Sequence, residues 1–75
     1  MYKRLKELRE DNDLLQKQIA IPLNITRQQY GLYESGERKL PLEKAIILAK
    51  FYNTSIDYIV ELTNETKPYP RIKNK

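Results

Sequence analysis

The chain has 75 residues, with 14 basic and 10 acidic side chains, no cysteine and no histidine. This length predicts one small domain without a catalytic cleft between lobes, and the composition excludes disulfides and the usual zinc clusters. No apolar run is long enough for a membrane span or a signal peptide, so we expect a cytoplasmic protein with no membrane partner. The net charge of +4 is compatible with a nucleic-acid partner but does not require one.

The first predicted helix covers residues 2–11, where one stripe carries apolar side chains and a single arginine. The members of this stripe are Tyr2, Leu5, Leu8 and Arg9. A second helix begins at Gln16, and its apolar side is formed by Leu14, Leu15, Ile19 and Leu23. Pro22 removes one main-chain hydrogen bond near its end, so we expect the helix to kink or stop there. Asn24 follows and tolerates the left-handed conformation that a tight turn requires.

The third predicted helix runs from an N-cap at Thr26 to about Ser35, where Gly36 stops it. Gln29 stands three residues after Thr26 and can close a capping box. The helical spacing then places three residues on one side, which we take as the inner side: Tyr30, Tyr33 and Glu34.

The opposite side of this helix carries a guanidinium and an amide near the N-terminus, then a glycine and an aliphatic residue. These four residues are Arg27, Gln28, Gly31 and Leu32. Arginine pairs well with guanine and glutamine with adenine in the major groove, and an aliphatic group can meet the thymine methyl. A glycine allows the backbone to approach a duplex closely. From the residues alone, an ordinary solvated helix face is the alternative interpretation.

Two charged residues fall on inner helix faces. Arg9 follows Leu5 by four positions in the first helix, and Glu34 accompanies Tyr30 in the third. Their opposite charges predict a partly buried ion pair that joins the two helices. The alternative is that each side chain reaches water separately.

The fourth predicted helix runs from Leu42 to Tyr52, with Asn53 as a left-handed C-cap, and a fifth begins after an N-cap at Ser55. The core side of the fourth helix is assigned to Leu42, Ala45, Ile46, Leu48, Ala49 and Tyr52. Three further apolar residues are assigned to a contact between two copies of the chain: Ile47, Phe51 and Tyr58. The alternatives are that the C-terminal tail folds back over them or that they are scattered surface residues.

The tail, residues 63–75, contains two prolines and four basic residues against one acidic residue. This composition predicts an extended or flexible segment after a domain formed by residues 1–62. Such a tail could attract phosphates or reach a partner, and a plain solvated terminus is the alternative.

Residues 2–62 resemble the helix-turn-helix domain of the lambda repressor and Cro family, also called the XRE family. The shared features are LKELRE at 5–10, Gln16, Ala20, Thr26, YESGERK at 33–39, LAK at 48–50 and Ser55-Ile56-Asp57. The resemblance implies an all-α, compact five-helix domain that binds a specific site in double-stranded DNA and regulates transcription, in the manner of a repressor. It also implies a homodimer, a palindromic operator and a recognition helix at about residues 26–35.

In this interpretation the outer face of the third helix reads bases, through Arg27, Gln28, Gly31 and Leu32. The contacts to DNA phosphates are assigned to Gln16, Lys17, Gln29, Arg38 and Lys39. For Arg38 and Lys39 a solvated loop is the alternative. The chain departs from the family pattern at Leu15, where relatives place a serine or threonine that caps the second helix.

A second class of function is a protein-interaction module on the same scaffold, such as an antitoxin-like partner. Its support is the apolar set Ile47, Phe51 and Tyr58. An enzyme is not expected, because the chain offers no nucleophile–base pair, metal cluster or phosphate-cradling glycine loop. We likewise expect no cofactor, no metal and no small-molecule ligand.

Overall fold

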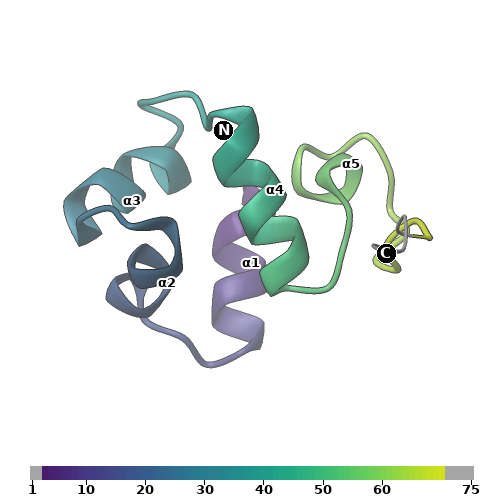
Figure 1. Cartoon of the computed structure of the whole chain (residues 1–75), viewed down its shortest axis with the longest axis horizontal. Coiled ribbons are helices and arrows are strands. Elements are labelled where there is room, and N and C mark those ends of the chain that lie inside the picture. Colours follow the sequence, from purple (N-terminus) through teal and green to yellow (C-terminus); the bar gives the residue numbers. More distant parts are fainter. Residues whose placement is uncertain (1–2, 71–75) are drawn as a thin grey trace, which may run out of the picture.

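The computed structural model describes residues 3–70, so residues 1–2, which include Tyr2 of the first predicted stripe, and residues 71–75 lie outside the described part of the chain. The described residues form five helices and no strand: α1 (Lys3–Asp11), α2 (Gln16–Leu23), α3 (Arg27–Ser35), α4 (Leu42–Phe51) and α5 (Ile56–Ile59). In Figure 1, α2 and α3 lie at one end of the molecule and α4 runs through its middle, with α5 and residues 60–70 at the other end. The predicted all-α, five-helix architecture is confirmed.

The core is built from buried side chains that come from all five helices. They are Leu5, Ile19, Ala20, Leu23, Tyr30, Tyr33, Leu48, Ala49 and Ile59. α3 packs against α1 and α2, α2 packs against α4, and α5 packs against α1 and α4. The position of α3 in the molecule is therefore set mainly by the first two helices.

The end of α2 forms a tight turn into α3. The helix continues one residue past Pro22, and Asn24 then adopts a left-handed conformation with φ 57°. The main-chain N–H groups of Asn24 and Ile25 donate to the carbonyl oxygens of Ile21 and Ala20, at 3.0 and 3.1 Å. These two bonds are the Schellman arrangement that closes a helix C-terminus. The helix end near Pro22 and the left-handed turn at Asn24 were both predicted correctly.

The start of α2 differs from the prediction at Leu15. This residue was placed on the apolar side of the helix, but its side chain is 57% exposed. Leu15 is the N-cap, with an extended backbone, so its side chain does not follow the helical stripe. Its N–H donates to Gln18 Oε1 at 2.7 Å, which satisfies one of the free donors at the helix start without a hydroxyl cap.

The predicted capping box of α3 is present. The Gln29 N–H donates to Thr26 Oγ1 at 3.1 Å, and the Thr26 N–H donates to Gln29 Oε1 at 3.0 Å. Gly36 ends the helix with φ 84°. Because the cap fixes the first helical residue as Arg27, both Arg27 and Gln28 lie in the first turn of α3.

The core side of α4 is narrower than predicted. Ala45, Leu48 and Ala49 are buried, but Leu42 is 67% exposed and Ile46 is 38% exposed. Leu42 is the first residue of the helix.

Ile47, which was assigned to a contact between two copies of the chain, is half-buried and packs against the core of its own domain. α4 lies between the α2–α3 pair and α5 (Figure 1), so side chains on both of its flanks can find partners. Asn53, which follows the end of this helix, adopts the left-handed conformation that was predicted, with φ 54°.

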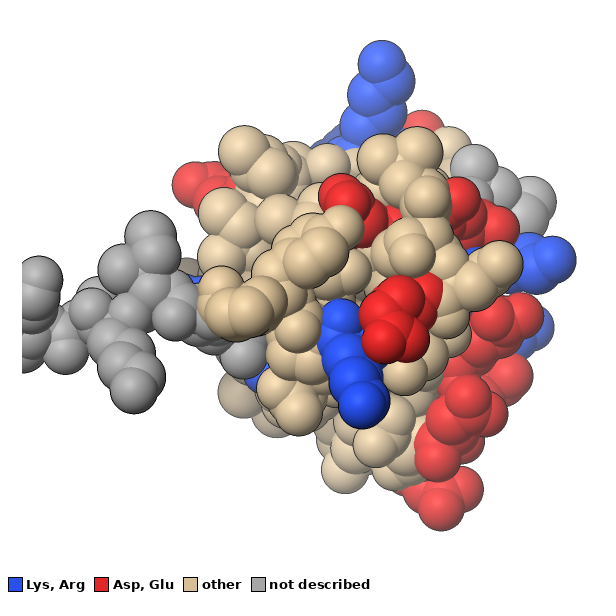
Figure 2. Space-filling view, turned by 90° about the vertical axis from the view of Figure 1, so that its right-hand side faces the viewer, with Lys and Arg blue, Asp and Glu red and all other residues tan. Residues whose placement is uncertain are grey.

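The tail was predicted to be extended or flexible, and its described part, residues 63–70, forms no helix or strand and is mostly exposed. Three of these residues, Thr63, Asn64 and Tyr69, hydrogen-bond to the domain. Arg4 Nη1 donates to the carbonyl oxygens of Tyr58 and Thr63, at 3.0 and 3.1 Å, and Nη2 donates to Asn64 Oδ1 at 2.8 Å. The Tyr69 hydroxyl donates to Asp57 Oδ2 at 2.6 Å. Figure 2 looks onto this end of the molecule and shows mostly uncharged residues, with acidic side chains along one edge.

None of the helices in the described part of the chain is long and apolar enough to cross a bilayer.

Candidate nucleic-acid interface

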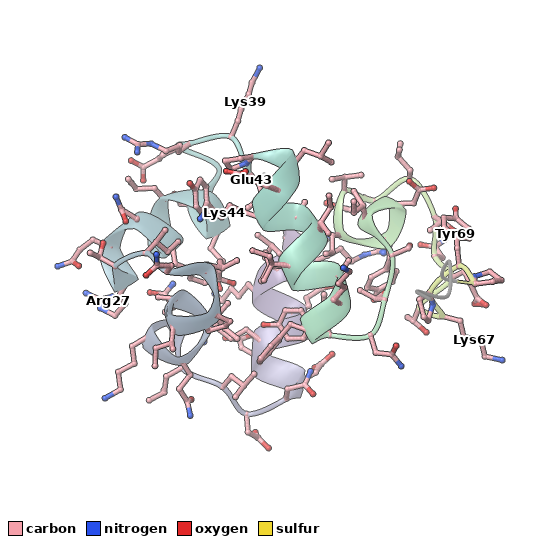
Figure 3. All side chains as sticks on the ribbon, in the orientation of Figure 1. Arg27, Lys39, Glu43, Lys44, Lys67 and Tyr69 are labelled. Atoms are coloured by element: carbon pink, nitrogen blue, oxygen red, sulfur yellow. The ribbon has the colours of Figure 1, made fainter. Side chains whose placement is uncertain are left out.

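The outer face of α3 is open to solvent. Arg27 and Gln28 are exposed and Gly31 and Leu32 are half-exposed, while Tyr30 and its inner neighbours are buried. Figure 3 shows Arg27 at the end of the molecule that α2 and α3 form. The structure therefore brings all four residues assigned to base reading onto one accessible side of the helix.

Gln16 connects the start of α2 to this face. Arg27 Nη1 donates to Gln16 Oε1 at 3.2 Å, and Gln16 Nε2 donates to Glu34 Oε1 at 3.2 Å. The amide of Gln16 thus bridges the exposed face of α3 and its buried side. Lys17 follows in the first turn of α2, and an open hollow is lined by Arg9, Leu15, Gln16, Lys17 and Arg27.

Arg9 and Glu34 form a bidentate ion pair behind Gln16. Arg9 Nε donates to Glu34 Oε2 at 2.7 Å and Nη2 donates to Oε1 at 3.2 Å, with the two side chains only 13% and 7% exposed. Arg9 Nη1 also donates to the Leu14 carbonyl at 3.0 Å. A continuous chain of hydrogen bonds therefore runs from the α1–α2 connection, through Arg9, Glu34 and Gln16, to Arg27.

The surroundings of Glu34 keep its charge. Burial alone favours the protonated acid, but hydrogen bonds from Arg9 and Gln16 and the positive charge of Arg9 outweigh burial and lower the pKa of Glu34. The hydrogen bond to Glu34 raises the pKa of Arg9. Burial, together with the Glu34 charge, raises the pKa of Tyr52 to about 12 and raises the pKa of Tyr30. At neutral pH the site is thus one buried ion pair among neutral tyrosines.

Gly31 has no packing reason within the domain to be a glycine. A Cβ added at this position would meet Gln16 Oε1 at 3.7 Å, which is ordinary van der Waals contact. Glycine inside a helix costs roughly 0.5–1 kcal/mol relative to alanine. Because Gly31 has no side chain, nothing projects from the middle of the outer face of α3.

The remaining phosphate candidates occupy different places. The side-chain oxygen of Gln29 is used in the capping box, and Arg38 and Lys39 are exposed in the loop after α3. Lys39 projects away from the body of the molecule (Figure 3). Neither α2 nor α3 has an acidic residue in its first turn, so the partial positive charge of each helix N-terminus is not neutralised from within that turn.

Two cationic side chains that position the helices were missed from the sequence. Lys44 Nζ donates to the carbonyl oxygen of Leu23, the last residue of α2, at 2.8 Å. Arg4 joins α1 to α5 and residues 63–64. A basic residue on a helix is usually solvated, so neither contact is expected from the sequence. For Lys44 the one available signal was that α2 has no basic residue of its own in its last turn.

The residues assigned to a contact between copies do not form one exposed surface. Phe51 is 46% exposed, but Ile47 packs against the core and Tyr58 lies under the Arg4 guanidinium, 4.1 Å from the ring centroid. Among residues 3–70, no group of three or more acidic, cysteine or histidine side chains is placed to hold a metal ion.

Known proteins resemble the chain over nearly the whole described region. A family model described as helix-turn-helix matches residues 5–59. An uncharacterized HTH-type transcriptional regulator of Bacillus subtilis, YobD, is 41% identical over 76 residues, which cover 100% of this chain and 66% of the relative. The cryptic phage CTXphi transcriptional repressor RstR of Vibrio cholerae is 32% identical over 72 residues, or 96% of this chain and 64% of the relative. The chain thus spans less than two thirds of the length of these relatives, and no solved structure matches it significantly.

Proposed function

We propose that this chain, which belongs to the helix-turn-helix family of lambda repressor and Cro type, regulates transcription by placing α3 in the major groove of a specific double-stranded DNA site. The observation that carries the proposal is the two-sided character of α3. Its inner side is fixed by buried tyrosines and the Arg9–Glu34 pair, and its outer side offers an exposed arginine and glutamine.

Each outer residue has a role that suits its chemistry. Arg27 can donate two hydrogen bonds to a guanine, and Gln28 can pair with an adenine through its donor and acceptor atoms. Leu32 can meet a thymine methyl, and Gly31 lets the helix backbone come close to the base edges. The absence of an internal packing reason for Gly31 supports this role.

The phosphate contacts are proposed for the side chains that flank α3. Gln16 and Lys17 lie at the N-terminus of α2, where free N–H groups also favour an anion. Gln29, Arg38 and Lys39 would contact the backbone on either side of the groove. Such contacts set the position of a protein on the duplex without reading its sequence.

We further propose that the protein acts as a homodimer on a palindromic operator, and that it represses transcription in the cytoplasm. Two recognition helices about 34 Å apart would then enter successive major grooves. The similarity to a phage repressor supports the repressor role. Of the residues first assigned to the dimer contact, only Phe51 is exposed, so it is the one we retain. The antitoxin-like alternative is not favoured, because the apolar set that supported it, Ile47, Phe51 and Tyr58, does not form one exposed surface.

Selection of bound duplexes from a random pool tests this function. We expect one enriched sequence with two related half-sites, and a binding constant that falls steeply as salt is raised, because bound phosphates release counterions. A pool that stays random, with affinity that depends on salt alone, would show nonspecific binding and refute the proposal. Lack of binding at any salt concentration, together with a co-purifying protein, would favour the interaction module.

A further inference from the structure

The C-terminus of α2 is completed by a residue from another helix. The turn itself satisfies the carbonyls of Ala20 and Ile21 through the N–H groups of Ile25 and Asn24. The Leu23 carbonyl accepts its hydrogen bond from Lys44 Nζ, 2.8 Å away in α4. Figure 3 shows Lys44 extending from α4 toward the side of the molecule where α2 and α3 lie.

This end of α2 needs such a partner. The last carbonyls of a helix carry a partial negative charge that a cation stabilises. α2 has no basic residue in its last turn, and Pro22 has already removed one of its internal hydrogen bonds. Lys44 is half-buried, and its ammonium supplies the missing positive charge. A hydrogen bond from a charged donor is stronger than one between neutral groups.

The anchored carbonyl stands directly before the recognition helix. Only Asn24, Ile25 and Thr26 separate Leu23 from α3. α3 packs against α1 and α2, and α2 packs against α4, so a shift at the end of α2 is passed to α3 through the turn.

We propose that Lys44 is a positioning residue for DNA recognition. By holding the Leu23 carbonyl against α4, it fixes the turn and therefore the angle at which Arg27 and Gln28 meet the bases. The consequence for DNA rests on the proposed function, and the anchoring of the turn can be measured without DNA.

The test compares three variants of the full chain. Lys44→Met keeps the apolar stem but removes the ammonium, Lys44→Arg keeps a cationic donor, and Lys50→Met removes an exposed charge from the same helix. Two quantities are measured: the hydrogen-exchange rates of the Asn24 and Ile25 amides relative to the buried Leu48 amide, and the ratio of affinities for the selected and a random duplex at fixed salt.

For Lys44→Met we expect the Asn24 and Ile25 amides to exchange about tenfold faster, as the loss of a hydrogen bond to a charged group implies. The affinity ratio should fall by about tenfold, because misplaced base contacts lose their advantage over phosphate contacts. Lys44→Arg should restore most of both quantities. Lys50→Met should lower both affinities alike and leave their ratio unchanged.

Uniform acceleration of every amide in Lys44→Met, with an unchanged affinity ratio, would overturn the proposal, since Lys44 would then contribute only to global stability. A wild-type protein without any sequence preference, but with local acceleration in Lys44→Met, would refute the proposed function and still support the anchoring of the turn. Unchanged exchange at Asn24 and Ile25 would overturn the anchoring itself.

Discussion

Arg9 and Glu34 form an ion pair in which the loss of one charge alone should strongly destabilise the folded protein. The pair makes two hydrogen bonds and is almost fully covered, so each charge depends on the other for its stabilisation. Glu34→Ala should lower the free energy of unfolding by about 3–5 kcal/mol, because it strands the guanidinium in the interior. Urea unfolding measures the loss, and Glu10→Ala on the exposed side of α1 is the control, with a change within about 0.5 kcal/mol.

A double-mutant cycle shows whether the two residues act as a pair. Arg9→Met combined with Glu34→Ala should cost clearly less than the sum of the two single changes, because no charge is left unpaired. Strictly additive losses would mean that the residues stabilise the fold independently, and would contradict the role given to the pair.

Acid should weaken the protein partly through Glu34. Its pKa in the folded chain lies below the ordinary value of 4.5, so the unfolded chain takes up a proton first as the pH falls. Its stabilising contribution is complete above about pH 4.5 and is lost as the pH drops through the folded pKa. Below pH 4.5 the stability of the wild-type protein should fall more steeply than that of Glu34→Gln, by up to about 1.4 kcal/mol per pH unit. Parallel curves would contradict the lowered pKa.

Among the elements, α3 depends most on its cap. The Thr26 hydroxyl accepts the Gln29 N–H and begins the helix at Arg27. Thr26→Ala should lower the free energy of unfolding by about 1 kcal/mol through loss of this bond, whereas Thr66→Ala at an exposed position after α5 should have little effect. Thermal unfolding of the two variants side by side measures the difference. Equal midpoints would show that the cap adds nothing to the stability of the helix.

The ends of the helices could be read from the sequence because their chemistry is local. The Thr26–Gln29 box spans four residues, and the left-handed positions at Asn24, Gly36 and Asn53 each rest on the conformational tolerance of one residue. The side of α4 that faces the core could not be predicted in the same way. Other helices cover its flanks, so burial depends on residues outside α4. The spacing of its own apolar residues does not indicate that Ile47 packs inward and that Ile46 stays partly exposed.

In the candidate site, too, the features that depend on local spacing were predictable and the long-range contacts were not. The outer face of α3 follows from helical spacing, and the charged residues on two inner faces pointed to Arg9 and Glu34. The contacts that orient the site join residues far apart in the chain. Gln16 lies 11 residues from Arg27, and Leu23 lies 21 residues from Lys44, so no local sequence pattern predicts either hydrogen bond.

α3 and residues 63–70 lie at opposite ends of the molecule. Figure 3 shows Arg27 at one end and Lys67 and Tyr69 at the other. Lys67 therefore does not extend the basic surface beside α3. If the basic tail attracts DNA, this residue would meet phosphates away from the groove that α3 is proposed to enter.

Arg4 holds the end of the molecule that contains residues 63–70, because it donates hydrogen bonds to residues more than 50 positions away in the chain. Arg4→Met should free residues 63–70, because it removes three hydrogen bonds and the contact with the Tyr58 ring. Cleavage after Glu65 by a glutamate-specific protease, followed by mass spectrometry, should become faster in this variant than in the wild type or in Arg38→Met. Unchanged cleavage would mean that Tyr69 and Asp57 hold the segment without Arg4.

Base reading by the outer face of α3 can be tested by repeating the duplex selection with variants of that face. Arg27→Ala and Gln28→Ala should each lose preference at one position of the half-site, at a cost of about 1–3 kcal/mol for the original duplex. Lys17→Ala, at an exposed phosphate candidate in the first turn of α2, should weaken selected and random duplexes by comparable factors and leave the preferred sequence unchanged. If the two α3 variants instead selected the wild-type sequence at every position, this face of α3 would not be the part of the protein that reads DNA.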